Sequence, residues 1–275
     1  MQQGELAQQI RTVTQLGGVV HALRALASAR RRQAQERFAG LERYADATRA
    51  TLAQALALLD RSEARAEPRA RWVVVLFSEH GFVGALNERL LDFARETARD
   101  ARLVAVGARG RRLCDERGID ASDGGAMPTT VAGAQDAAQR LVESWFPAIA
   151  ERRVDEIRVV FAEHIPPMGW KPRALRVFPP DVASVDASPD ARPLHTLAAR
   201  DLVARAAEEF VFAQASWAVG EAFASEQAAR FVAMDASHKH IDDKLRELRA
   251  LERALRQETT TNEILEIVAG AGAAT

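Results

Sequence analysis

The sequence predicts an α/β middle domain, a small sheet flanked by helices, inserted between two long N- and C-terminal helices that form an antiparallel coiled coil. Three observations support this fold class. All ten prolines lie between Pro68 and Pro193, and proline breaks helix interiors. Both proline-free flanks carry apolar residues at helical spacing. Between the flanks, short apolar runs rich in β-branched residues alternate with helical segments, which is typical of a parallel sheet.

Three parts are therefore expected: an N-terminal coiled-coil helix over 1–67, a Rossmann-like α/β domain over 68–193, and a C-terminal coiled-coil helix over 194–275. The chain has 275 residues, 48% of them hydrophobic, which is enough for a real core. Its net charge of −1 gives no reason to expect nucleic acid or anionic lipid as a partner. A single cysteine, Cys114, excludes an intrachain disulfide and fits a reducing compartment. No run approaches about 18 apolar residues, so we expect no membrane span.

The first flank is predicted to be one helix over about 5–59. Its apolar or small residues recur at alternating steps of four and three, as in a narrow coiled-coil seam: Ala34, Phe38, Leu41, Ala45, Thr48, Leu52, Ala55 and Leu59. Gly17 and Gly18 each cost about 1 kcal/mol relative to alanine, so we expect a bend or a weak point there. The basic run at 30–32 is either a solvated helix face, which the residues alone favour, or a contact with acidic groups of a partner.

The middle of the chain alternates buried strands and helices. In order, we expect a buried parallel strand at 72–77 (WVVVLF), a glycine-bearing loop at 78–84, a helix at 85–100, a second buried strand at 103–106, a loop leading into a short helix over 107–118, a loop at 120–128, a helix at 132–150, a third strand at 157–162 and an antiparallel fourth strand at 173–178. Polar or proline-rich connectors are expected at 61–71 and 179–193.

The last flank, 194–268, is predicted to be one helix, or two helices with a joint near Gly220. At a rise of 1.5 Å per residue it would be about 110 Å long, so no domain of ordinary size could cover it along its whole length. Its natural partner is the first flank, antiparallel, because the two flanks bracket one folded domain. Since the flanks differ in length, part of the longer helix must extend beyond the pair.

No catalytic or cofactor site is expected from the motifs. The loops at 78–84 and 107–110 follow strands and are short, but they lack the glycine-rich patterns that hold phosphates, so ordinary turns are favoured. The histidines are scattered, and His238 and His240 lie two apart and do not share a helix face, so a metal site is not expected. No Ser/His/Asp or Cys/His arrangement stands out.

Four separated segments resemble the gamma subunit of F-type ATP synthases, and they occur in the family's order. They are IRTVTQLGGVVHALRALASAR (10–30), SEHGFVGALNERLL (78–91), ASEQAARFVAMDA (224–236) and RQETTTNEILEIVAGAGA (256–273). The chain departs from the family pattern at Glu79-His80, at Val83 in place of a cysteine, at Leu23 in place of a methionine, and at Gly17-Gly18. These departures are typical of a divergent branch, and the alternative is the gamma subunit of a sodium-translocating alternate-type ATPase.

The resemblance implies that the chain is the central rotor shaft of a rotary ATP synthase. It would couple ion flow through the membrane ring to conformational cycling of the catalytic beta subunits, and would itself carry no catalytic site and no cofactor. The implied partners are the alpha and beta subunits, the epsilon subunit and the membrane c-ring, with no nucleic acid. The implied location is peripheral, on the cytoplasmic face of the bacterial inner membrane.

The resemblance also implies which residues contact partner subunits. The family's polar catch against the beta subunits corresponds to Arg256, Gln257 and Thr261. A second, basic contact corresponds to Arg24 and Arg30, which raises the weight of the partner-contact interpretation of the basic run. An apolar bearing surface at the end of the last helix corresponds to Ile264, Leu265, Ile267 and Val268.

Two rival interpretations remain open at this stage. A free-standing scaffold or homodimeric coiled coil would explain the periodicity, but it would not explain the four matching segments. A small-molecule-binding or enzymatic α/β domain with helical extensions would explain the middle of the chain, but it lacks the expected phosphate and catalytic motifs.

Overall fold

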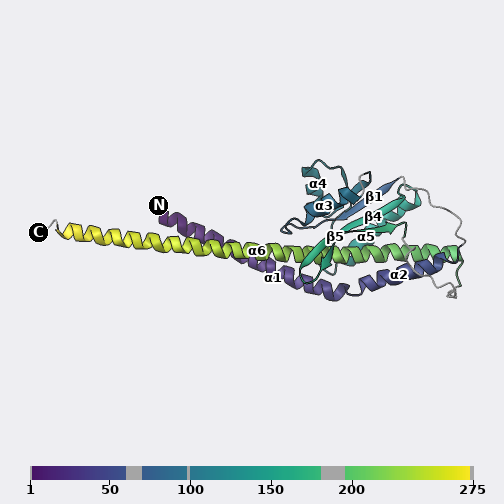
Figure 1. Ribbon diagram of the computed structural model, residues 1–275, viewed down its shortest axis with the longest axis horizontal. Helices are drawn as coiled ribbons and strands as arrows, with labels where there is room; N and C mark the ends of the chain where they lie inside the picture. The colour runs from purple at the N-terminus through teal and green to yellow at the C-terminus, as the bar shows by residue number, and fades with distance from the viewer. Residues whose placement is uncertain (1, 60–69, 98–99, 181–195, 273–275) are drawn as a thin grey trace. The chain divides into compact units, whose positions relative to one another are not determined.

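The computed structural model describes residues 2–59, 70–97, 100–180 and 196–272 (Figure 1). Its elements in order are α1 (Gln2–Phe38), α2 (Leu41–Leu56), β1 (Arg71–Leu76), α3 (Leu86–Thr97), β2 (Arg102–Val106), α4 (Ala108–Glu116), β3 (Ala121–Asp123), α5 (Ala134–Ala150), β4 (Glu156–Ile165), β5 (Gly169–Phe178) and α6 (Ala199–Gly272). The predicted fold class, an α/β middle between two long helical flanks, is confirmed.

The chain forms two compact units, and neither coincides with one predicted part. One unit is Ala27–Arg230, and the other combines Met1–Leu26 with Phe231–Thr275. The predicted boundaries at 67/68 and 193/194 fall within 60–69 and 181–195, outside the described residues, and so do most of the two predicted connectors. That three-part division therefore stays a prediction.

A five-stranded sheet of order β3-β2-β1-β4-β5 forms the centre of the larger unit. The pairs β1/β2, β1/β4 and β2/β3 are parallel, while β4 and β5 are antiparallel and joined by the turn at 166–168. The strand β3 was missed, because its three residues, ASD, carry no apolar run and the segment was expected to be loop. The other four strands were predicted, with β4 and β5 longer than expected.

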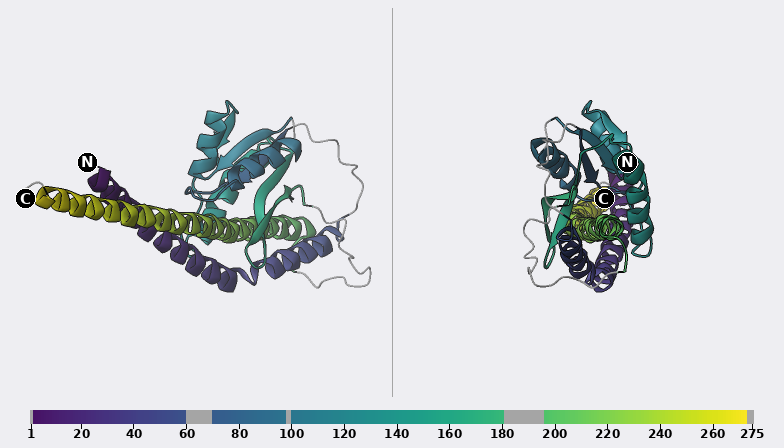
Figure 2. Two further views of the ribbon diagram at one scale, coloured as in Figure 1. Left: turned by 60° about the vertical axis from the view of Figure 1, so that its left-hand side comes forward. Right: turned by 90° about the vertical axis from the view of Figure 1, so that its right-hand side faces the viewer.

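Helices cover both faces of this sheet, which is why its central strands are apolar on both sides. Val74 and Leu76 of β1 belong to a core shared with α2, α5 and the first part of α6. Their neighbours Val73 and Val75 belong to a second core built with α3 and Cys114 of α4. The two views of Figure 2 show the green first part of α6 running alongside the sheet. Successive side chains of a strand point to opposite faces, so β1 needs apolar residues at every position.

The predicted first helix is interrupted, whereas the last flank forms one helix, the first of the two possibilities predicted for it. The first flank breaks into α1 and α2 at Ala39 and Gly40, whereas α6 continues through Gly220. The reason is a close helix crossing. A Cβ atom on Gly220 would lie 3.0 Å from the Leu41 side chain and 3.2 Å from that of Phe38, so the glycine lets α6 approach the α1–α2 junction.

Most of the predicted seam of the first flank lies on the buried face of α1 and α2 in the larger unit, whereas Leu59 falls beyond α2 and is half-buried. Ala34, Ala45 and Leu52 are at most 2% exposed. Leu52 and Ala45 pack into the core that includes α5 and α6, and Gln214 of α6 donates a hydrogen bond to the Ala45 carbonyl at 3.1 Å. The alanines of the seam therefore serve close helix contact, as their spacing predicts.

The smaller unit is an antiparallel helix pair, as predicted for the two flanks. Gly17 lies against Ile241, and the rings of His21 and His238 lie 5.7 Å apart between centroids, tilted by 59°. The contacts run in opposite directions along the two helices, with Val20, Met234 and Ile241 forming the buried centre. The helix α1 passes through Gly17 and Gly18 without interruption. Gly17 faces the partner helix, where an added Cβ would lie 3.2 Å from an Ile241 methyl group.

Toward the end of α6, the side chains from Leu251 to Leu265 are not buried by the described part of the chain. Leu248 is 6% exposed, but Leu251 is 51% exposed and every side chain described from there to Leu265 is exposed or half-exposed. The prediction that the longer helix extends beyond its partner is confirmed within this unit (Figure 1).

Candidate functional site

Two of the four matching segments contact each other in the larger unit. The loop at 78–84 packs against α6, where Glu226 and Arg230 form a buried ion pair one helical turn apart. Glu226 accepts a hydrogen bond from the backbone N–H of Glu79 at 3.4 Å. Arg230 donates to the carbonyls of His80 and Gly81, each at 3.3 Å. A buried ion pair whose remaining polar atoms are bound by backbone fixes the loop on the helix.

The carboxylate of Glu79 binds two further backbone segments. Its Oε2 atom accepts from the N–H of Ala108 at 3.2 Å and of Met127 at 2.9 Å. It thus joins the loop after β1, the start of α4 and the loop after β3. Its role in this chain is to hold three loops together.

The start of α4 was one of the two places where a phosphate seemed conceivable. Three backbone amides at this helix start donate to other groups of the chain: Gly107 to the Gly125 carbonyl at 2.9 Å, Ala108 to Glu79, and Arg109 to the Ser78 carbonyl at 3.3 Å. Helix N-termini attract anions through unpaired amides, and here the chain's own groups bind three of them.

Glycine is required at position 107, immediately before α4. Gly107 has a φ of 100°, and an added Cβ would lie 2.7 Å from the carbonyl oxygen of Phe77. No side chain fits that approach without moving the backbone of Phe77 and Ser78, just after β1.

Burial raises the pKa of Glu226 above its usual value, even though Arg230, the Glu79 amide and His80 favour the charged form. The ion pair therefore depends on Arg230, since a buried carboxylate without its cation would take up a proton. Glu226, Arg230 and the loop backbone bind one another, as expected of a structural contact between the loop and the helix.

The basic residues of α1 have different surroundings. Arg24, half-buried, forms an ion pair with Asp235 of α6 at 2.8 Å. Arg31 donates to Gln35 at 2.8 Å and to the carbonyl of Pro167 in the β4–β5 turn at 3.3 Å. Arg32 is exposed and Arg30 half-buried. Arg31 therefore faces its own unit, and the predicted partner contacts at Arg24 and Arg30 stay predictions.

The predicted polar catch lies on the uncovered part of α6. The Arg256 side chain is 75% exposed and contacts Glu252 at 3.4 Å, while Gln257 and Thr261 are exposed. The hydroxyls of Thr260 and Thr261 donate to carbonyls one turn earlier, at 3.0 and 2.8 Å. With their hydroxyls bound to the helix, the threonines leave mainly methyl groups for a partner.

The predicted bearing surface follows directly along α6. Ile264 and Leu265 are 56% and 60% exposed. Ile267 and Val268 lie on the helical backbone, and their side chains are outside the described ones. Exposed large apolar side chains at a helix end are typical of an interaction surface.

Neither a metal site nor a membrane span is found in the described part of the chain. Among those residues, no group of three or more His, Cys, Asp or Glu side chains could hold a metal ion. Within the same ranges, no helix is both long and apolar enough to span a bilayer.

The cluster of Glu79, Glu226 and Arg230 was missed by reasoning from the sequence. A signal was present, since a Glu and an Arg four residues apart stand in the mostly apolar segment 222–234. That spacing suggests an ion pair, but an exposed pair is the commoner outcome.

Comparisons with known proteins agree on one family. A family profile described as ATP synthase matches residues 2–274. The ATP synthase gamma chain of Thermobifida fusca is 28% identical, covering 96% of this chain and 93% of that one, and the gamma chain of Moorella thermoacetica is 28% identical, covering 98% of each. The fold is similar to a chain of the Euglena gracilis mitochondrial ATP synthase rotor in rotational state 1, with a TM-score of 0.68 at 14% identity, covering 94% of this chain and 99% of that one. The chain therefore belongs to the ATP synthase gamma family.

Proposed function

We propose that this chain is the central rotor shaft of a rotary F-type ATP synthase, coupling ion flow through a membrane ring to conformational cycling of the catalytic beta subunits. The observation that carries the proposal is the match to the family over residues 2–274, which spans both helical flanks and the α/β middle. A scaffold with a chance coiled coil would not share all three parts in the same order.

The helices suit a shaft. At 1.5 Å per residue the 74 residues of α6 correspond to a helix of about 110 Å, without an internal proline. The exposed side chains from Leu251 to Leu265 would be covered by the ring of alpha and beta subunits. Rotation of such an asymmetric body would push each beta subunit through different conformations in turn, without any chemistry on the shaft.

Torque must pass between the α/β domain and the shaft. The first part of α6 shares a core with the sheet, and the ties from Glu226 and Arg230 to the loop at 78–84 lock the same helix to the other sheet face. These contacts make the domain and this part of α6 one rigid body, which supports the proposal that the domain is the foot driven by the c-ring and epsilon subunit.

The chain would contribute no catalytic residue, and catalysis would reside on the beta subunits. We place it peripherally, on the cytoplasmic face of the bacterial inner membrane. The catch at Arg256, Gln257 and Thr261, the basic contact at Arg24 and Arg30, and the bearing surface at 264–268 are the proposed contacts with the ring.

Co-expression with alpha and beta subunits of the same organism tests the proposal. We expect a complex of all three chains in size-exclusion chromatography, with ATPase activity. If the folded chain never enters such a complex, the rotor proposal is wrong, and a homodimer in the same experiment would favour the scaffold.

A further inference from the structure

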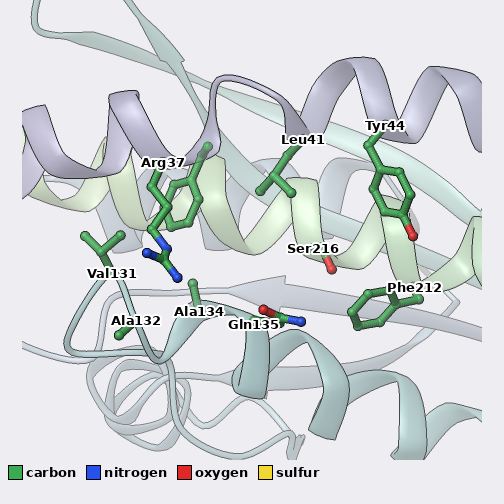
Figure 3. A pocket seen from close by; sticks show the side chains of 10 residues that line it. Arg37, Leu41, Tyr44, Val131, Ala132, Ala134, Gln135, Phe212 and Ser216 are labelled. Carbon is green, nitrogen blue, oxygen red and sulfur yellow. The ribbon is translucent and has the colours of Figure 1, made fainter.

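A cavity of about 300 Å³ lies in the unit Ala27–Arg230, between the α1–α2 junction, α6 and the segment that leads into α5 (Figure 3). Its volume is at the lower end of the range of small-molecule sites. It shares no lining residue with the loop at 78–84 or with the exposed end of α6. Neither the proposed shaft function nor its predicted contacts use it.

One end of the cavity is apolar. Phe212 of α6 and Leu41 of α2 are half-buried and border the space, and Tyr44 presents its ring beside Phe212 (Figure 3). Aromatic and aliphatic walls of this kind bind an apolar ligand body by removing its surface from water.

The other end carries a positive charge. Arg37 is exposed, and its guanidinium extends toward the segment 131–134 (Figure 3). In the described ranges of the chain, no carboxylate forms an ion pair with Arg37. An unpaired guanidinium beside an apolar wall offers a carboxylate two parallel hydrogen bonds.

Ser216 supplies a second polar group between these two ends. The residue is 8% exposed, and its hydroxyl has no hydrogen-bond partner among the described residues. In Figure 3 the oxygen is directed from α6 toward the cavity. A buried hydroxyl without a partner is costly, so a ligand acceptor at this point would be stabilised.

The apolar end of the cavity, where Tyr44 lies, disfavours an anion. The Tyr44 hydroxyl donates a short hydrogen bond to Glu209, and burial together with this carboxylate raises the pKa of Tyr44 to about 12. The phenol therefore stays neutral and the negative charge of Glu209 lies next to it. A ligand carboxylate would be repelled there and attracted to Arg37, which fixes one orientation.

We propose that this cavity binds a small aromatic carboxylate, with its carboxylate at Arg37, its ring against Phe212 and an acceptor near Ser216. The site is independent of the rotor function and would give the chain a ligand-binding activity of its own. Because the cavity joins α1, α2, α6 and the start of α5, a bound ligand would also stabilise their packing.

Ligand-observed NMR on the full-length chain tests the site with three matched probes: 4-phenylbutyrate, 4-phenylbutanol and 4-phenylbutylamine. We expect saturable binding of the carboxylate with a Kd on the order of 1 mM, and binding of the alcohol and the amine at least about 5-fold weaker. Equal binding of all three probes would overturn the proposed charge recognition.

Three variants locate the binding. Arg37→Gln should weaken 4-phenylbutyrate binding by about 10-fold, the usual range for loss of one charge-assisted pair. Arg43→Gln, which removes an exposed arginine of α2 outside the cavity, should leave it unchanged. Ala132→Phe, at an exposed position of the rim, should block the cavity without altering the circular dichroism spectrum. Unaltered binding in both Arg37→Gln and Ala132→Phe, or no saturable binding to the unmodified chain, would refute the proposal.

Discussion

Within the larger unit, polar residues tie a loop to α6. Glu226 and Arg230 lie on α6, about 147 positions from the loop they hold, as the hydrogen bond from Glu79 to Glu226 shows. Their helical spacing was visible in the sequence, but not their burial. Burial depends on which loop packs over α6, and periodicity in one segment carries no information on that. Likewise, the link from Glu79 to Ala108 and Met127 joins three loops that no local pattern connects.

Removal of Arg230 should therefore be strongly destabilising. Arg230→Met keeps most of the volume but leaves the Glu226 carboxylate buried without its cation, which typically costs about 3–5 kcal/mol. The matched control is Arg246→Met, where the ion pair with Asp243 is solvent-exposed, so the change should stay within about 0.5 kcal/mol. Urea unfolding of both variants measures the difference. Equal effects of the two substitutions would show that the buried tie contributes little.

The substitution Arg230→Met should make the free energy of unfolding depend on pH. The pKa of Glu226 is raised in the folded chain, so the folded state binds this proton more tightly than the unfolded state, whose value is near 4.5. The contribution of this proton to the free energy of unfolding is fully present below the pKa of the unfolded state. It is lost as the pH rises through the pKa of the folded state. Without Arg230, only His80 and the Glu79 amide favour the charged form, so the loss of stability in Arg230→Met should be smaller at about pH 5 than at about pH 8. A loss that is the same at both pH values would contradict this account.

At the scale of elements, periodicity predicted almost every helix and strand. Most of the seam of the first flank is buried as expected, and α6 is one helix of 74 residues. The break between α1 and α2 was not predictable, because Gly40 alone is a weak signal and the crossing with α6 at Gly220 involves a segment far along the chain. Gly220 suggested a joint from sequence, whereas in the structure it is the point of close approach.

Gly220→Val tests this crossing. Its side chain would collide with Leu41 and Phe38, and overpacking of this kind costs about 1–3 kcal/mol. Gly18→Ala is the matched control, since no atom lies within 4 Å of its added Cβ, and helix propensity predicts a gain of about 1 kcal/mol. Thermal unfolding should shift in opposite directions for the two variants. A stabilised Gly220→Val chain would rule out the close approach.

At the scale of the whole molecule, the resemblance and the structure supply different parts of the candidate site. The four matching segments identified the family, but only the fold explains why the segments at 78–91 and 224–236 occur together: they form one buried contact. The proposed contacts with other subunits would involve exposed side chains of α6, whose partners would be other chains. Physical reasoning from one chain can therefore identify the uncovered surface but not the residues that cover it.

The proposed catch on α6 can be separated from folding in an assembled complex. Arg256→Ala with Gln257→Ala removes a charged and a polar group from an exposed surface, so unfolding of the α/β domain should be unchanged. ATPase activity of the complex should fall about 10-fold, as for loss of a charge-assisted hydrogen bond to the ring. Arg249→Ala with Arg253→Ala, also exposed on α6, is the control and should retain activity. Unchanged turnover in the first variant would argue against the catch.

The central claim is that the chain turns inside a ring of alpha and beta subunits. A bead attached to the α/β domain reports this rotation directly. Arg112→Cys, exposed on α4, provides the attachment, because Cys114 is buried and burial raises the pKa of its thiol, which slows its labelling. With the alpha and beta subunits fixed to a surface, we predict that ATP drives continuous rotation of the bead in one direction. A complex that hydrolyses ATP while its bead shows only random motion would contradict the account.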